Sequence, residues 1–292
     1  MKPYQHIAIR ECHEPLVPIP LQQFAVQHPH PYVALGAPYG DRSPYCLRQG
    51  VLERLLIAQT ALQQHCPGWQ IQIFDAYRPL PVQHYMVDYT LEQLVRSHQL
   101  TPDHLTAIQR QEFLAQVYQF WAVPNHNPLT PPPHSTGAAI DITLATADGE
   151  PVDMGSPIDE LSSRSYPDHY APAATTTQPP PSHTAFHHHR QLLNRVMCQA
   201  EFYRHPTEWW HFSYGDQLWA WLKQQEQGEG FVVAQYGRVE DEAGRQAGRQ
   251  AGCRLLRRSG GMSGGAGLCK AACEANEAAS NLRIYRVAIS PL

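Results

Sequence analysis

The sequence predicts one α+β domain over residues 1–236, and this prediction depends on two periodicities and on their order along the chain. Apolar residues recur at helical spacing between residues 47 and 62, and they alternate with polar residues from Trp69 to Phe74. Helical patterns collect in the first half of the 292 residues, and short strand patterns come later. This order is typical of α+β folds and differs from the regular strand–helix alternation of a doubly wound sheet.

The first half of the chain holds three predicted helices and one predicted strand. The helices cover residues 47–62, 80–100 and 102–122. The first helix ends before Pro67 and Gly68, a pair that favours a turn, and the strand over residues 69–74 follows at once. Thr101 is a candidate N-cap of the third helix, with Pro102 in its first turn.

The second half alternates irregular segments with short regular ones. A proline-rich loop over residues 124–134 leads into a predicted strand over 138–144, and a long irregular stretch covers 146–186. Loops of this length are usually lids or disordered segments. The last predicted elements are a helix from about His188 to Glu201, a strand over 207–214 and a helix over 216–225.

Residues 237–292 differ in composition from the rest of the chain. They carry nine Lys and Arg against five Asp and Glu, nine of the 19 glycines and one aromatic residue, Tyr285. The stretch 243–252 repeats every four residues and has neither the helical nor the strand period of a buried face. We expect a disordered or weakly helical tail, because such a segment cannot offset the entropy of ordering. An interaction tail is the alternative.

The composition of the whole chain argues against several classes of protein. The formal net charge is −4 and the pI is near 6.5, whereas nucleic-acid-binding domains carry a basic surface. No apolar run reaches the roughly 18 residues of a membrane-spanning helix, and the N-terminus does not resemble a secretory signal. Seven cysteines, an odd number with no CxxC pair, argue against a disulfide framework. We therefore expect a cytoplasmic protein that binds neither nucleic acid nor membrane, and its oligomeric state stays open.

Two motifs place metal-binding side chains beside predicted strands. In PHSTGAAID, His134 and Asp141 flank a turn at Gly137, so an imidazole and a carboxylate can meet at one cation. In EWWH, Glu208 and His211 lie among tryptophans, where burying an ionisable group without a partner is costly. Each motif alone has a structural alternative: a capping aspartate with a surface histidine for the first, and a hydrogen-bonded Glu–His pair in the core for the second.

A third motif, FDAYRP, ends the strand predicted over residues 69–74. Pro79 biases Arg78 toward extended geometry, so the guanidinium leaves the sheet in a fixed direction. A permanently charged, forked donor in that place suits an anion or a developing oxyanion. The alternative is a surface ion pair between Arg78 and Asp75.

Together the three motifs predict a hydrolytic metal site. Two histidines and one carboxylate, His134, His211 and Asp141, leave a fourth position for water, which is the pattern of a catalytic site with one zinc per chain. Zinc lowers the pKa of a bound water to about 7. Glu208 can take that proton and deliver it to a leaving amine, while Arg78 holds the oxyanion. These groups suffice for metal-assisted hydrolysis of an amide.

FDAYRP, HSTGAAIDITL and EWWHFSY, in this order and at these distances, resemble the motifs of VanX-type D-alanyl-D-alanine dipeptidases. The resemblance covers residues 1–236 and implies the fold of the zinc D,D-peptidases, which the Hedgehog signalling domain shares. In that fold a small antiparallel sheet packs with helices, and the zinc site lies at the sheet. The resemblance implies the same three zinc ligands, with Glu208 as general base and Arg78 stabilising the transition state. The implied reaction is hydrolysis of D-Ala-D-Ala to two molecules of D-alanine.

The resemblance also implies groups that bind the dipeptide. The segment DMGSPID ends at Asp159, which would bind the free amine and so restrict the enzyme to dipeptides; the alternative is a loop aspartate that caps a turn. Two features depart from the family. Three prolines, residues 131–133, stand where a small hydroxyl residue often precedes the first zinc histidine, which leaves Ser135 or backbone amides as candidates to bind the substrate carboxylate. The tail over residues 237–292 has no counterpart in the family.

Two other functions stay open on the sequence. A D,D-carboxypeptidase or muropeptide-trimming peptidase would use the same metal site but needs room for a blocked amine, and Asp159 argues against it. A non-catalytic zinc-binding module would need neither Glu208 nor Arg78. The run of three histidines at residues 187–189 is a less suitable metal site, because neighbouring side chains on a helix point about 100° apart and do not converge on one ion.

Overall fold

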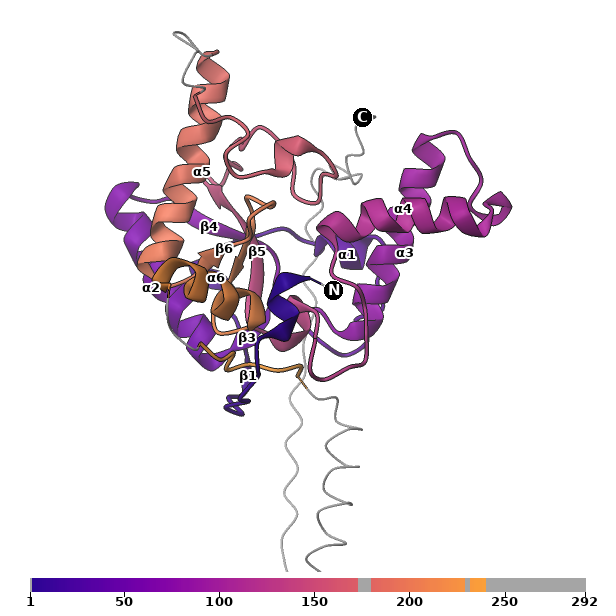
Figure 1. The fold of residues 1–292 in the computed structure, drawn as a ribbon. Coiled ribbons are helices and arrows are strands. Elements are labelled where there is room, and N and C mark those ends of the chain that lie inside the picture. The colour runs from indigo at the N-terminus through magenta and orange to yellow at the C-terminus, as the bar shows by residue number, and fades with distance from the viewer. Residues whose placement is uncertain (1, 173–179, 229–231, 240–292) are drawn as a thin grey trace, which may run out of the picture. The chain divides into compact units, whose positions relative to one another are not determined.

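The computed structural model describes residues 2–172, 180–228 and 232–239 (Figure 1). The predicted tail over residues 237–292 therefore lies outside the described residues, apart from its first three. Among the helices described, none combines the length and the apolar composition needed to cross a bilayer. The described cysteines are free thiols: Cys12, Cys46, Cys66 and Cys198.

A five-stranded sheet carries its strands in the order β2–β4–β5–β7–β6. Their bounds are Ala25–Val26 (β2), Gln70–Asp75 (β4), Ala139–Ala145 (β5), Tyr203–Arg204 (β6) and His211–Ser213 (β7). All neighbouring strands are antiparallel except β2 and β4, so the sheet predicted as antiparallel has one parallel edge strand. A separate two-stranded sheet pairs β1 (Leu16–Pro18) with β3 (Cys46–Arg48).

The described chain combines these sheets with α-helices, and the predicted α+β class is confirmed. The α-helices of the described chain are α1 (Pro31–Ala34), α2 (Gln49–His65), α3 (Leu80–Ser97), α4 (Ala107–Phe120), α5 (Pro181–Gln199) and α6 (Gln217–Gln227). Short 3-10 helices are η1 (Pro3–His6), η2 (Leu21–Gln23), η3 (Pro102–His104), η4 (Pro133–Thr136) and η5 (Ser163–Ser165). The helices predicted over 47–62, 80–100 and 216–225 correspond to α2, α3 and α6.

The helix predicted from Pro102 begins later, at Ala107, and the predicted cap is wrong. The Thr106 hydroxyl accepts a hydrogen bond from the Gln109 amide, and the Gln109 side chain accepts one from the Thr106 amide in return. This reciprocal capping box makes Thr106 the N-cap, so the helix begins at Ala107. The Thr101 side chain makes no capping hydrogen bond, and the residues after it form only the short helix η3.

Two elements near the C-terminal end of the described chain also differ from the prediction. α5 begins at Pro181, earlier than the predicted start near His188, because a proline is well tolerated in the first turn of a helix. Of the strand predicted over 207–214, only β7 pairs with its neighbours β5 and β6. The residues just before β7 form a turn and a bend instead of strand.

The main hydrophobic core lies between one face of the sheet and helices α2 and α5 (Figure 1). Alternate residues of β4 and β5 point into it, and all are fully buried: Ile71, Ile73, Ile140, Ile142 and Leu144. The residues of the two helices that share this core include Leu55, Leu62, Leu193 and Val196. A second apolar cluster holds α3 against α4 and includes Val87, Leu91 and Val117.

A β-bulge in β4 turns Asp75 toward the opposite face of the sheet. Ile73 lies opposite Ile142 of β5, but Asp75, two residues on, lies opposite Asp141, so β4 carries one extra residue. Residues directly opposite each other on antiparallel strands point to the same face. Asp141 is in turn opposite His211 of β7. Asp75, Asp141 and His211 therefore form a row across three strands, on the face away from the α2 and α5 core.

A buried arginine of α5 holds the loop that carries Asp159. Arg190 is fully buried and donates hydrogen bonds to the carbonyls of Met154, Arg164 and Tyr166 and to the Ser156 hydroxyl. None of these four acceptors is a carboxylate, so these bonds clamp the loop to the helix without an ion pair. The clamp fixes the path of residues 154–166 and with it the place of Asp159.

Candidate active site

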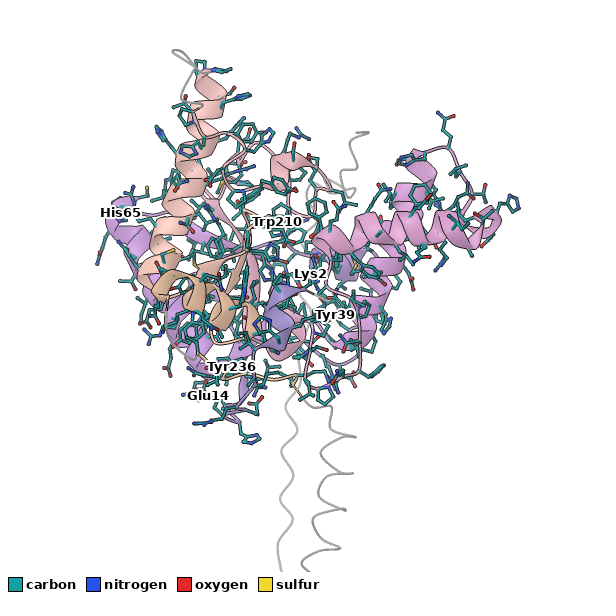
Figure 2. All side chains as sticks on the ribbon, viewed as in Figure 1. Lys2, Glu14, Tyr39, His65, Trp210 and Tyr236 are labelled. Carbon is teal, nitrogen blue, oxygen red and sulfur yellow. The ribbon has the colours of Figure 1, made fainter. Side chains whose placement is uncertain are left out.

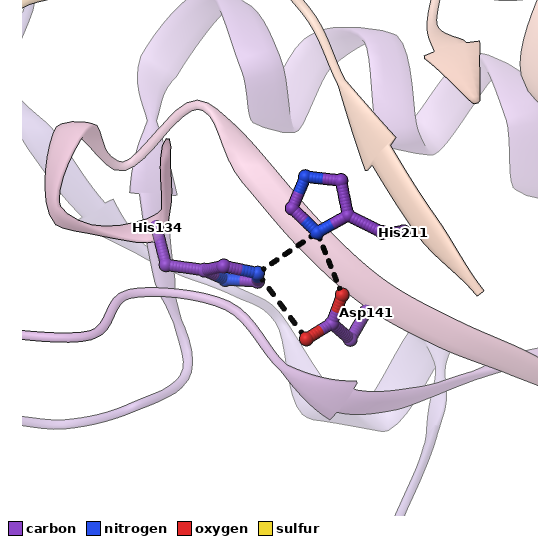
Figure 3. Close-up of side chains that lie close together, drawn as sticks. All are labelled: His134, Asp141 and His211. Carbon is purple, nitrogen blue, oxygen red and sulfur yellow. Dashed lines mark hydrogen bonds and ion pairs between the residues drawn. The ribbon is translucent and has the colours of Figure 1, made fainter. Parts of the chain in front are cut away.

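Three side chains able to bind a metal ion converge on the sheet (Figure 3). His134 comes from η4, Asp141 from β5 and His211 from β7. His134 Nε2 lies 3.1 Å from His211 Nδ1 and 3.2 Å from Asp141 Oδ2, and His211 Nδ1 lies 3.0 Å from Asp141 Oδ1. All three residues are buried, and one ligand atom from each lies within 4.8 Å of the others. The structure thus brings together the three residues that the motifs singled out as ligands.

The turn that delivers His134 depends on Gly137. η4 ends at this glycine, whose φ of 71° lies in the left-handed region. The left-handed backbone conformation favours glycine, and a Cβ atom there would also come 2.6 Å from Leu16 Cδ1 of β1 and displace the end of that side chain. The chain then enters β5, which brings Asp141 back to His134.

Each imidazole has one nitrogen facing the common centre and the other bonded within the protein. His134 Nδ1 donates to the Ala76 carbonyl over 2.7 Å, which leaves the Nε2 electron pair facing the centre. His211 Nε2 lies 3.4 Å from Ser213 Oγ, and that hydroxyl donates to Asp216 Oδ2 over 2.8 Å. Contacts of this kind fix the tautomer and the ring orientation of metal-binding histidines.

Asp141 is ionised in this setting. Burial alone would raise the pKa of its carboxyl, but His134 and His211 hold that pKa well below its usual value. The Arg78 guanidinium also lies close, with its Nη2 3.3 Å from Asp141 Oδ2. Two imidazoles and one carboxylate form a donor set that suits a divalent cation.

Glu208 lies beside this centre. Its Oε2 is 3.9 Å from His211 Nδ1 and its Oε1 is 3.7 Å from His205 Nδ1, so neither histidine is hydrogen-bonded to it. The hydrogen-bonded Glu–His pair, the structural alternative for this motif, is therefore wrong. Burial and then the Asp141 carboxylate raise the pKa of Glu208 well above its usual value. A carboxyl with a raised pKa next to metal-binding groups is suited to proton transfer.

Arg78 is buried in a polar network. Its Nε donates to Asp75 Oδ2 over 2.9 Å, its Nη1 to Gln83 over 3.0 Å and its Nη2 to the Tyr32 hydroxyl over 3.2 Å. Because Asp75 is fully buried, the alternative of an exposed Arg–Asp pair is wrong. Burial would raise the pKa of Asp75, but Arg78 and His30 lower it to about 2, so the pair is ionised.

A cavity opens beside the candidate ligands and carries charges of both signs. Its charged walls, besides the ligands themselves, are Lys2, Arg78, Asp159 and Glu208. Its aromatic walls include Tyr4, Phe120, Trp121 and Trp210. Sites for small ligands typically place a small number of charged groups among apolar walls. A ligand with one positive and one negative end fits these four charged side chains.

The two residues predicted to bind substrate are placed differently. Asp159 lines the cavity with a φ of 64°, and its carboxylate accepts a hydrogen bond from the Tyr32 hydroxyl over 2.8 Å. Burial and then the Asp141 carboxylate raise the pKa of Asp159 to about 7. Ser135 is buried away from the cavity lining, and its hydroxyl donates to the Arg78 carbonyl over 2.8 Å.

Comparison with known proteins assigns the family. A family model described as D-Ala-D-Ala dipeptidase matches residues 25–228, which contain all three motifs. The chain belongs to the D-Ala-D-Ala dipeptidase family. The resemblance drawn from the motifs is confirmed by this match, and with it the peptidase class of the enzyme.

Two curated relatives in this dipeptidase family are D-alanyl-D-alanine dipeptidases. The one from Synechocystis sp. is 51% identical over 241 residues, which cover 82% of this chain and 98% of the relative. The one from Escherichia coli is 38% identical over 81 residues, which cover 27% of this chain and 36% of the relative. Among solved structures, a mutant of the vancomycin-resistance D,D-pentapeptidase VanY in complex with Zn(II) is 15% identical, with a TM-score of 0.36 over 63% of this chain and 80% of its own.

Sequence reasoning missed three residues around the candidate site: His30, Tyr32 and Tyr39. Asp75 accepts a hydrogen bond from the Tyr39 hydroxyl over 3.0 Å, and His30 Nε2 lies 3.2 Å from the same carboxylate. Tyr32 bonds to two of the predicted site residues. All three come from residues 30–39, where only the short helix α1 is regular. No periodicity marks such a segment, and the density of tyrosine and histidine is the one signal that the sequence offers there.

Proposed function

We propose that this member of the dipeptidase family hydrolyses D-Ala-D-Ala to two molecules of D-alanine with one zinc ion held by His134, Asp141 and His211. The observation that carries the proposal is the convergence of these three side chains, with ligand atoms within 4.8 Å of one another, beside the buried carboxyl of Glu208. We propose further that the reaction takes place in the cytoplasm, the location predicted from the sequence, and that the free dipeptide is the binding partner.

The donor set fits zinc. Two imidazole nitrogens and a carboxylate face a common point, and each imidazole is held through its second nitrogen. Two histidines and a carboxylate are the protein ligands of many catalytic zinc sites, which keep a further position open. Zinc in such a site polarises a carbonyl group and lowers the pKa of a water molecule to about 7.

Glu208 and Arg78 have complementary roles in the proposed reaction. Glu208 accepts a proton from the attacking water and passes it to the leaving nitrogen, and its raised pKa favours the protonated form that the second transfer needs. Arg78 lines the cavity and stabilises the negative charge that develops on the scissile oxygen. Asp75 and Gln83 fix its guanidinium in advance, so little reorganisation is needed during the reaction.

Asp159 supplies the selectivity for dipeptides. Its carboxylate pairs with the ammonium group of the substrate, while the Tyr32 hydroxyl holds the carboxylate in place. In a longer peptide an uncharged amide takes the place of this ammonium. The half-buried carboxylate would then have no cation to pair with, which is unfavourable.

Asp159 also makes substrate binding depend on pH. With a pKa of about 7, its carboxyl takes up a proton as the pH falls below 7, and the neutral form no longer pairs with the ammonium, which stays charged. We therefore expect KM for D-Ala-D-Ala to rise as the pH falls through the pKa of Asp159, by up to about tenfold per pH unit, and a zinc ion on Asp141 would move this pKa to lower pH because it offsets the Asp141 charge. In the Asp159→Asn variant, KM measured by steady-state kinetics should be raised and flat over the same range. A variant that keeps the same rise in KM would contradict the assignment.

A substrate panel measured with and without metal tests the proposed function. We expect chelation to abolish hydrolysis of D-Ala-D-Ala and added zinc to restore it, whereas L-Ala-L-Ala should be a poor substrate. N-acetyl-D-Ala-D-Ala lacks the amine charge and should be rejected. Hydrolysis of the acetylated peptide would favour a D,D-carboxypeptidase, and zinc binding without hydrolysis of any dipeptide would favour a binding module.

A further inference from the structure

The N-terminal segment forms part of the cavity wall. η1 packs against α6, where the Gln217 side chain donates to the Ile7 carbonyl over 2.6 Å. This contact fixes Lys2 and Tyr4, both of which line the cavity. Figure 2 labels Lys2 and Trp210, which both line the cavity. The segment thus brings a cation to a site built mainly from distant strands.

Lys2 is a half-buried cation with unused donors. Its Nζ donates to the Gln119 carbonyl over 3.2 Å, which is the one hydrogen-bond partner of this ammonium within the described chain. An ammonium group has three donors, so two remain for a ligand. The other cationic side chain of the cavity, Arg78, is already paired with the carboxylates of Asp75 and Asp141. Lys2 therefore brings a positive charge that no described carboxylate pairs with.

The two cations lie on different sides of the cavity. Arg78 Nη2 lies 3.2 Å from the Tyr32 hydroxyl, and that hydroxyl donates to Asp159 Oδ2 over 2.8 Å, so Arg78 lies on the side of the amine-binding aspartate. Lys2 caps η1, which packs against α6, the helix that follows β7, and Glu208 comes just before β7. Lys2 therefore enters the cavity with the segment that also carries the proton-transferring glutamate.

The covalent structure of a dipeptide decides which of its charges reaches each side. One carbon separates the ammonium from the scissile carbonyl, and one carbon separates the carboxylate from the scissile nitrogen. In the proposed reaction Asp159 binds the ammonium and Glu208 delivers a proton to the nitrogen. The carboxylate must then lie close to Glu208, on the side where Lys2 presents its free donors.

We propose that Lys2 binds the carboxylate of the C-terminal residue of the dipeptide, an inference that rests on the proposed function. The substrate is then recognised at both ends, because Asp159 binds its ammonium group and Lys2 binds its carboxylate. Peptides that are amidated or extended at the C-terminus have no carboxylate in this place. Lys2 therefore selects for a free C-terminal carboxylate, as Asp159 selects for a free amine. This second contact comes from the N-terminal segment and not from the three motifs.

Kinetics of the Lys2→Ala variant on D-Ala-D-Ala and on D-Ala-D-alaninamide test this inference. The amide keeps the ammonium and the scissile bond but has no carboxylate charge. We expect KM for D-Ala-D-Ala to rise about tenfold or more in the variant, and KM for the amide to change less than about twofold. Lys2→Arg keeps the charge and should recover most of the affinity. Lys223→Ala is the matched control, because this lysine of α6 lies over the Trp219 ring and outside the cavity lining.

Calorimetry provides a readout that does not depend on turnover. In a zinc-loaded Glu208→Gln background, the dissociation constant of D-Ala-D-Ala should also rise about tenfold or more when Lys2→Ala is added. Equal losses on the two substrates, or a change in kcat without a change in KM, would show that Lys2 acts through Glu208 and would overturn the proposal. Unchanged KM and dissociation constants would overturn it while leaving the proposed function intact. Failure of the unmodified protein to hydrolyse D-Ala-D-Ala would overturn both.

Discussion

Glu208→Gln is expected to lower kcat for D-Ala-D-Ala by about 10²–10⁴-fold while the zinc content stays that of the unmodified protein. Glutamine has nearly the same size and shape as glutamate, but it can neither take a proton from water nor return one to the leaving nitrogen. Glu208 Oε2 lies 3.9 Å from His211 Nδ1, too far for a hydrogen bond to that ligand, so its replacement should leave the three ligands in place. Steady-state kinetics together with metal analysis on the same preparation measure both quantities.

The matched control for this variant is Glu226→Gln. Glu226 belongs to α6 and accepts a hydrogen bond from the Tyr203 hydroxyl at an exposed position outside the cavity lining. Its kcat should therefore equal that of the unmodified protein. A Glu208→Gln variant with kcat within about threefold of normal would remove Glu208 from the proton transfers. Loss of zinc in that variant would instead make Glu208 part of the metal site.

His134→Ala is expected to abolish both zinc binding and hydrolysis. The variant retains only two of the three candidate ligands, Asp141 and His211, and it also loses the hydrogen bond from His134 Nδ1 that ties the ring to the Ala76 carbonyl. Changing a residue that merely supports a ligand typically costs 10–100-fold in metal affinity, so loss of the ligand itself should cost more than about 100-fold. Competition with a chromogenic chelator measures the affinity, and hydrolysis of D-Ala-D-Ala measures the activity.

His188→Ala is the control for the ligand variant. His188 is exposed on α5 and belongs to the run of three histidines at residues 187–189, so this control also tests that run as a competing metal site. We expect normal zinc affinity and normal turnover. Zinc loss in His188→Ala together with zinc retention in His134→Ala would place the metal on α5 and would contradict the proposed site.

The candidate ligands could be predicted from the sequence because each lies where the chain enters or follows a strand of one sheet. His134 precedes β5, which carries Asp141, and His211 begins β7, the neighbour of β5. Arg78 follows β4, the neighbour on the other side. Strand patterns are visible in local periodicity, and adjacent strands of a small sheet bring such positions together. The family resemblance then attached a reaction to this constellation.

The surroundings of the ligands could not be predicted, because they depend on contacts between distant segments. The bulge that turns Asp75 to the site arises from its pairing with β5, and the periodicity of β4 alone places Asp75 on the core side with Ile73. Strands β1, β2, β3 and β6 have two or three residues each, too few to show a period. The start of α4 depends on the reciprocal hydrogen bonds of Thr106 and Gln109. Thr101 is also a threonine, so the residue type alone does not show which of the two caps the helix.

The anomalous diffraction signal at the zinc absorption edge, measured on crystals of the metal-loaded protein, tests the central claim most directly. We predict one strong peak per chain, about 2.0–2.2 Å from His134 Nε2, His211 Nδ1 and a carboxylate oxygen of Asp141. Glu208 should lie next to that peak without binding the ion. A peak located elsewhere, or a crystal of active enzyme with no metal between these three side chains, would contradict the account.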